Sequence, residues 1–340
     1  MTGDMETGGE AQDPQVSPSA PTIAPEPPPD PLFSRVIGVI LSPVTTFRNV
    51  VTRPAWVGAF VIYLIAIGLS TVVYSLNVDW EALMRSQFED SLGWKLASSL
   101  VPEEKLSEVE HGAVEEILST GAGGMTLLTT ANTITGGAIG FIVMGIIFAT
   151  LFYLMGALGD LKLGRIYFDG FLCFLMFIAW AIIGAIVRGL FGSEARDALP
   201  WQAGVNTIFL FAFLYVVYKT VERQPAFKKL MSVYAHGMTI SVVASLLVIV
   251  VVLIQREPLT VGPDQVLRSN IAALAGMKGS GLVATILGAL DIFTLWQLVT
   301  LTIGFAAATG LSIWMTASIT FLPWGFVTMV KIAAAALFGA

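Results

Sequence analysis

Long runs of uncharged, apolar residues alternate with short charged segments along most of the chain, starting near residue 55. A transmembrane helix needs about 20 predominantly apolar residues, and seven segments meet this requirement. We expect membrane-spanning helices at residues 55–76, 136–158, 167–190, 203–221, 234–255, 284–307 and 313–338. The pattern therefore predicts an all-α fold, a polytopic bundle of about seven transmembrane helices.

A different pattern precedes the first span, in the stretch "LFSRVIGVILSPVTTFRNVVTRPAW" at residues 32–56. Its apolar residues follow helical spacing, and Ser42–Pro43 predicts a break followed by a second short helix. We expect residues 31–54 to form amphipathic helices that lie in the membrane interface with their apolar side down. The alternative is a soluble cap packed against the loops. The interfacial interpretation assigns lipid contacts to Arg35, Arg48, Arg53 and Trp56.

The rest of the chain divides by composition. Residues 1–30 contain seven prolines and six carboxylates but no Lys or Arg, which is typical of a disordered tail. Residues 55–340 form the expected transmembrane domain. Within it, residues 77–135 carry ten carboxylates against three basic residues, and we expect an acidic extracytoplasmic loop there.

Basic residues in short loops predict the orientation, because they remain on the cytoplasmic side. They precede the first span and recur in the turns near residues 162–165 and 219–229. We therefore expect a cytoplasmic N-terminus and an external C-terminus. The loop at 256–283 also carries basic residues on the outer side, but it is longer and counts less in this rule.

Composition supports lipid as the solvent of this protein. Apolar residues make up 55% of the chain and charged residues 12%, whereas a soluble domain carries about 25% charged residues. The net charge of −6 also argues against nucleic acid as a partner. The expected partners are membrane lipids, proteins that bind the N-terminal region or the helix faces, and a second copy of the chain.

Three ionisable residues share a depth in the outer half of the predicted bundle: Asp291, Lys331 and Arg188. Charges inside a bilayer are costly and often functional, so these residues form a candidate intramembrane polar site for an ion or small solute. The alternative is structural: Asp291 caps a helix, and the two basic side chains extend toward the headgroups.

The two histidines provide weaker candidates. His236 and Asp169 hold matching positions near the inner ends of two spans, and a contact between them would respond to pH. A histidine that caps a helix near the headgroups is the simpler interpretation. His111 shares a helix face with Glu108 and Glu115, as a metal site requires, but a solvated acidic face is the simpler explanation. We expect no metal and no cofactor. Nucleophile and phosphate-loop motifs are absent, so we do not expect an enzyme.

Three segments resemble the Yip domain family of Ypt- and Rab-interacting membrane proteins. They are "RVIGVILSPVTTFRNVVTRPAW" before the first span, "PAFKKLMSVYAHGMTISVV" at 225–243, and "LDIFTLWQLVTLTIGFAAATGLSIWMTASI" at 290–319. The resemblance covers residues 32–76 and 203–339. It implies five spans and a cytoplasmic N-terminus, so residues 136–190 would be an added hairpin. The Asp-Leu-Tyr-Gly-Pro motif of eukaryotic members is absent, and no GTPase contact carries over.

For a bacterial-type member, the resemblance implies a multi-pass protein of the bacterial inner membrane. Its expected function is non-enzymatic, either binding partner proteins or organising the membrane. The alternative is a small-solute or ion transporter that uses the polar site near Asp291.

Overall fold

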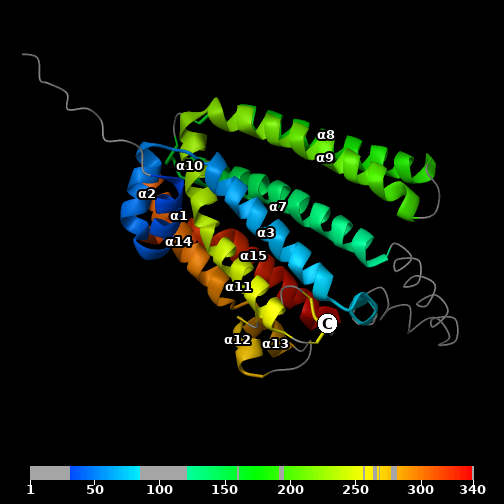
Figure 1. Cartoon of the computed structure of the whole chain (residues 1–340). Coiled ribbons are helices and arrows are strands. Elements are labelled where there is room, and N and C mark those ends of the chain that lie inside the picture. The colour runs from blue at the N-terminus through cyan, green and yellow to red at the C-terminus, as the bar shows by residue number, and fades with distance from the viewer. Residues whose placement is uncertain are drawn as a thin grey trace, which may run out of the picture. The chain divides into compact units, whose positions relative to one another are not determined.

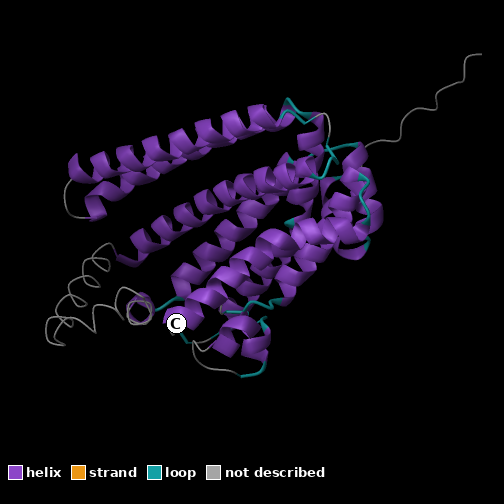
Figure 2. Ribbon diagram, turned by 180° about the vertical axis from the view of Figure 1, so that it is seen from behind, coloured by secondary structure: helices purple, strands orange, loops and turns teal. Residues whose placement is uncertain are grey.

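The computed structural model describes residues 31–84, 121–158, 161–190, 195–255, 257–262, 266–267, 269–276 and 282–338. In these ranges the chain is helical, with isolated β-bridges but no strand. The helices pack into an α-helical bundle, as the sequence predicts (Figures 1 and 2). Five segments are long and apolar enough to cross a membrane: Val57–Asn77, Gly123–Leu154, Pro225–Ile254, Ile292–Thr309 and Ile313–Val330. These segments and the fold identify an integral, multi-pass membrane protein.

Two short helices open the described chain, α1 (Leu32–Leu41) and α2 (Pro43–Thr52). Pro43 occupies the first turn of α2, where a proline costs no helical hydrogen bond. The predicted break at Ser42–Pro43 is therefore confirmed. A Cβ on Gly38 would collide with Oγ1 of Thr46, so this glycine lets α1 pack closely on α2.

The first span is confirmed as α3 (Val57–Asn77), which packs along α7 (Gly121–Leu154). We expected α7 to begin near residue 136, with residues 121–135 in the outer loop. That boundary is wrong, because residues 121–135 carry no charge and continue the helix. Ile134 in this part of α7 packs against Gly68 of α3.

Helices α8 (Leu163–Leu190) and α9 (Ala195–Glu222) lie side by side (Figure 1). They occupy the positions of the third and fourth predicted spans. Several of their side chains lie outside the described residues, so their crossing of the membrane stays a prediction.

The fifth predicted span consists of two consecutive helices, α10 (Pro225–Gly237) and α11 (Thr239–Ile254). The sixth is also divided. Asp291 separates the short α13 (Leu282–Gly288) from α14 (Ile292–Thr309), so the predicted start at residue 284 is wrong. A four-residue helix, α12 (Ile271–Leu274), precedes α13. The last helix, α15 (Ile313–Phe338), matches its predicted range.

Helix α10 lies at the centre of the main hydrophobic core. It contacts α1, α2, α3, α7, α9 and α14, and every residue from Leu230 to Gly237 is buried. Aromatic rings from several helices meet around it. Phe141 of α7 lies 5.0 Å from the Tyr234 ring, and Phe148 of α7 lies 4.9 Å from Phe305 of α14, measured between ring centroids. The N-terminal helices are therefore joined to the membrane domain through α10.

The two ends of the bundle differ. One end carries α1, α2 and the turns that connect α7 to α8, α9 to α10, and α14 to α15 (Figure 1). At the other end, Val78 pairs with Leu259, and the Tyr74 hydroxyl donates to the Val261 carbonyl over 2.8 Å. Residues 77–84 and the described part of loop 256–283 therefore share one end, as the predicted alternation of spans requires.

Candidate functional site

Arg35 of α1 joins the two N-terminal helices to each other. Its side chain is 5% exposed, and its Nη1 donates to the Arg53 carbonyl over 3.0 Å. Arg53 follows the last residue of α2, where helical carbonyls lack intrahelical donors. A charged donor on such a carbonyl makes a comparatively strong hydrogen bond. Arg35 therefore fixes the end of α2 relative to α1.

Further buried polar side chains lie on α10, which packs against α1. His236 is fully buried, and its Nδ1 lies 2.8 Å from the Ser232 carbonyl oxygen. Because a carbonyl can only accept, Nδ1 carries the proton. Arg35 belongs to α1, and α1 packs against α10. Arg35 Nε, His236 Nε2 and Ser232 Oγ have no hydrogen-bond partner among the described residues. We call Arg35, Ser232 and His236 the polar junction.

The polar junction corrects part of the predicted lipid contact. Arg35 cannot meet headgroups, because its side chain is turned inward onto the Arg53 carbonyl. Trp56 is also buried, at 2% exposure, and its ring stacks on Phe141 with centroids 6.1 Å apart. Arg48 is exposed and Arg53 is half-buried, so lipid contact at these two residues stays a prediction.

The outer side of α1 is apolar. Phe33, Ile37 and Leu41 follow each other at intervals of four, which places them on one helix face. They are 72%, 53% and 75% exposed, while Val39 on the opposite face is fully buried. We call Phe33, Ile37 and Leu41 the α1 stripe. Exposing this face to water would be unfavourable. It is the apolar side of the amphipathic helix that the sequence predicts at a membrane interface.

Asp291 acts as the N-cap of α14. Its Oδ1 accepts from the Thr294 backbone N–H over 2.8 Å, and its Oδ2 accepts from the Ser269 hydroxyl. Asp291 is thus a helix cap, which is the structural alternative that the sequence offers for this residue. The side chains of Lys331 and Arg188 lie outside the described residues, so their predicted pairing with Asp291 stays untested.

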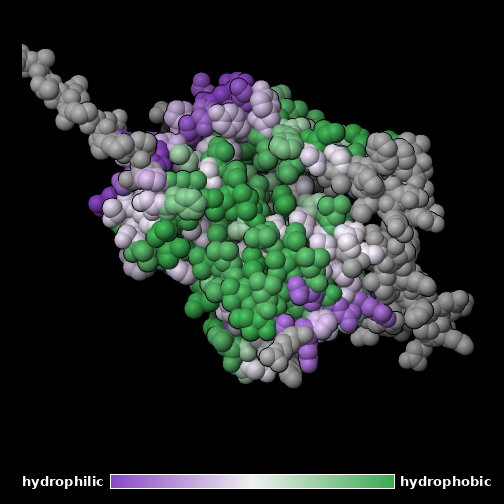
Figure 3. Space-filling view, viewed as in Figure 1, coloured by the Kyte–Doolittle hydropathy of each residue, from purple (hydrophilic) through white to green (hydrophobic). Residues whose placement is uncertain are grey.

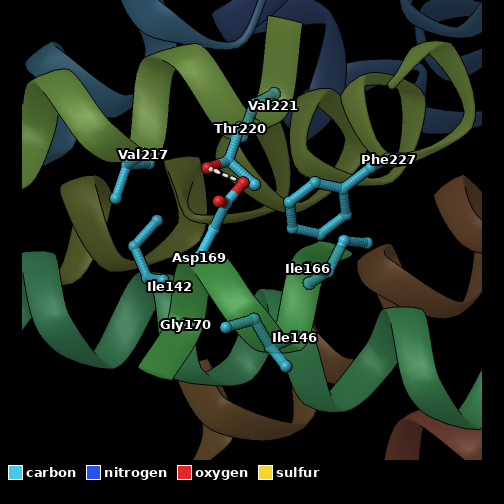
Figure 4. Close-up of a pocket in the computed structure, with 9 residues that line it drawn as sticks. All are labelled: Ile142, Ile146, Ile166, Asp169, Gly170, Val217, Thr220, Val221 and Phe227. Carbon is cyan, nitrogen blue, oxygen red and sulfur yellow. Dashed lines mark hydrogen bonds between the residues drawn. The ribbon is translucent and has the colours of Figure 1, made fainter. Parts of the chain in front are cut away.

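Asp169 of α8 does not pair with His236. Its Oδ2 accepts from the Thr220 hydroxyl of α9 over 2.8 Å, within a small pocket between α7, α8, α9 and α10 (Figure 4). The other lining residues are Ile142, Ile146, Ile166, Gly170, Val217, Val221 and Phe227. The pocket volume of about 20 Å³ suffices for one water molecule but for no larger ligand. The predicted group of His111, Glu108 and Glu115 lies outside the described residues.

One close contact was missed by the sequence interpretation. A Cβ on Gly304 of α14 would lie 2.6 Å from Val233 of α10 and 2.9 Å from the Phe47 ring of α2. Real side chains avoid such distances, so α2, α10 and α14 meet at a point that only glycine fits. The available signal was Gly304 itself, one of two glycines in the segment at 290–319, which resembles the final helix pair of the Yip domain.

Comparison with known protein families gives one match. Residues 203–335 match the family model described as the Yip1 domain. No curated protein and no solved structure matches the chain. The match contains two of the three segments that resemble the family and leaves out the first, at residues 35–56.

The matched segment and the unmatched N-terminal segment nevertheless share one core, because Phe47 packs against Gly304 and belongs to the same buried cluster as Tyr234 and Phe305. The match includes α10, α11, α14 and most of α15, which hold the buried centre of the bundle. Residues 203–335 are thus similar to a Yip1 domain, and the five apolar helices identify the chain as an integral membrane protein.

Proposed function

We propose that this chain is a non-enzymatic membrane-organising protein whose helices α1 and α2 form a platform in the cytoplasmic leaflet of the bacterial inner membrane. The observation that carries the proposal is the α1 stripe, whose three apolar side chains are 53% to 75% exposed. A helix with one apolar face gains free energy by burying that face at the boundary between headgroups and acyl chains.

The charges at this end of the bundle favour the cytoplasmic leaflet. Basic residues gather on α1 and α2 and on the turns near them, and Figure 3 shows hydrophilic residues over this end beside a broad hydrophobic surface. They are Arg35, Arg48, Arg53, Lys162, Arg165, Lys219, Arg223, Lys228 and Lys229. Anionic lipid headgroups attract such residues where they are exposed, as Arg48 is and the buried Arg35 is not. The proposal assigns the binding of protein partners in the cytoplasm to the proline-rich residues 1–30.

The depth of the α1 stripe tests the proposal. In a Cys173→Ala background, a nitroxide label is placed at Ile37→Cys or Leu41→Cys in proteoliposomes that contain anionic lipid. The matched control is Thr45→Cys, on the exposed polar face of α2. We expect labels at 37 and 41 to collide preferentially with apolar oxygen, and the label at 45 with a water-soluble nickel complex.

Preferential collision with the nickel complex at all three positions would contradict the proposal. Protection from both reagents at 37 and 41 would also contradict it, since a protein would then cover the stripe. Point substitutions are preferable to deletion of residues 31–54. Such a deletion would also remove the buried side chains of Val39, Phe47 and Val50 from the core.

A further inference from the structure

A groove opens on the surface between α2, α14 and the start of α15. Its volume is about 250 Å³, and it is lined by Val44, Arg48, Ile303, Ala306, Ala307 and Ile313. Figure 1 shows α2 directly beside α14 at this end of the bundle. The groove is separate from the α1 stripe, from the polar junction and from the cap at Asp291.

Small side chains and a sharp turn create the groove. Ala306 and Ala307 lie in the last turn of α14, where their methyl groups leave the space beside α2 unfilled. Gly310 ends α14 in the left-handed conformation, with φ of 72°, and α15 begins three residues later at Ile313. The chain therefore turns away before a larger side chain can close the hollow.

The charge in the groove is positive and uncompensated. Arg48 is exposed and is the one charged residue in the lining. The sequences of α2, α14 and α15 contain no Asp or Glu. Ile313 is also the first residue of α15, so the positive end of that helix dipole borders the groove. Among the described residues no carboxylate pairs with Arg48, and an apolar hollow beside such a guanidinium is complementary to an acyl chain attached to a phosphate.

We infer that this groove binds one anionic phospholipid, with Arg48 on its phosphate and the start of one acyl chain between Val44 and Ile303. The groove also continues into apolar surface on α14 and α15, where Val299 and Ile313 are 51% and 46% exposed. Trp314 beside it is 82% exposed, and an indole is favoured at headgroup depth.

This inference goes beyond the proposed function, since it assigns a selective site for one lipid molecule rather than a general contact of α1. Both proposals require α2 to lie at a membrane surface. A phosphatidylglycerol with a diazirine in its acyl chain, near the headgroup, serves as the probe. The full-length protein in detergent micelles is irradiated with it, in competition with unlabelled phosphatidylglycerol or phosphatidylcholine.

We expect cross-linked peptides from α2 and from residues 303–315, displaced more effectively by phosphatidylglycerol. Arg48→Gln should lower the preference for phosphatidylglycerol over phosphatidylcholine about fivefold, since one basic group near headgroups contributes about 1 kcal/mol. Ala307→Phe, at an exposed position, should fill the groove and abolish the cross-link. The matched control Arg165→Gln, exposed at the same end, should behave as wild type.

Two results would overturn the inference: an unchanged lipid preference in Arg48→Gln, or cross-links that persist at residues 303–315 in Ala307→Phe. The two experiments together distinguish failure of the lipid site from failure of the platform. Water-exposed labels on α1 together with a normal groove cross-link would reject the platform alone. Lipid-buried labels on α1 without a groove cross-link would reject the lipid site alone.

Discussion

At the scale of single residues, close helix contacts depend on positions where a side chain has no room. Gly304 is the clearest case, because its missing Cβ allows α14 to touch both Val233 and Phe47. Gly140 on α7 differs, since a Cβ there would meet nothing within 4 Å. The two glycines therefore serve different purposes despite their similar helical surroundings.

We predict that Gly304→Ala lowers the free energy of unfolding by about 1–3 kcal/mol, the usual cost of overpacking a core. Thermal unfolding in detergent, followed by tryptophan fluorescence, measures the loss. The control Gly140→Ala should be neutral or slightly stabilising, because alanine is the better helix former. Adding Val233→Ala to Gly304→Ala should recover part of the loss. Equal stability of the two glycine variants would contradict this explanation of the helix contact.

At the scale of elements, α1 and α2 behave as part of the membrane domain rather than as a loose appendage. Buried side chains from both helices enter the main core, and Arg35 ties their ends together through the Arg53 carbonyl. The outer face of α1 is left for a different surrounding. One short segment thus combines a packed side with an apolar exposed side.

We predict that Arg35→Met loosens this pair of helices, because the Arg53 carbonyl loses its donor while the apolar volume is largely kept. Limited proteolysis in detergent should cut residues 31–56 faster than in wild type. Arg35→Lys, which retains a charge but reaches less far, should be intermediate. Arg223→Met serves as the control at an exposed arginine. Unchanged proteolysis in Arg35→Met would show that the hydrogen bond contributes little to holding α2.

The helices were predictable from the sequence, but whether their side chains face lipid or another helix was less so. Apolar runs and Pro43 were sufficient to locate α1, α2, α3 and α15, because period and proline placement are local properties. Arg35 and Trp56 were expected to face lipid because amphipathicity does not distinguish a membrane from a neighbouring helix. The contact of Gly304 with Phe47 joins residues more than 250 positions apart, and no local pattern encodes it.

At the scale of the whole molecule, the spans separate two ends of unlike charge. The end with α1 and α2 is basic. At the other end, residues 77–84 meet residues 257–262, and these two segments carry Asp79, Glu81 and Glu257 but no Lys or Arg. If the basic end faces the cytoplasm, surface residues at the two ends must react with external reagents in opposite ways. Thr45 of α2 and Glu257 are both exposed and suit this comparison.

We predict that Glu257→Cys, in the Cys173→Ala background, is labelled by a membrane-impermeant maleimide on intact bacterial spheroplasts. Thr45→Cys should be labelled only after the membrane is permeabilised. The parent variant without cysteine provides the blank. Labelling of both positions from outside would contradict the crossing pattern, and the reverse order would place the N-terminal helices on the outer side.

The central position of α10 has a consequence for biosynthesis. Its neighbours α1, α2 and α3 are made before it, but α14 is completed only when residue 309 has been added, 72 residues after α10 ends at Gly237. At 5–20 residues per second, translation leaves this side of α10 uncovered for about 4–14 s. A ribosome stalled within that interval would leave a nascent chain whose central helix lacks one wall, and such a chain is a natural substrate for membrane quality control.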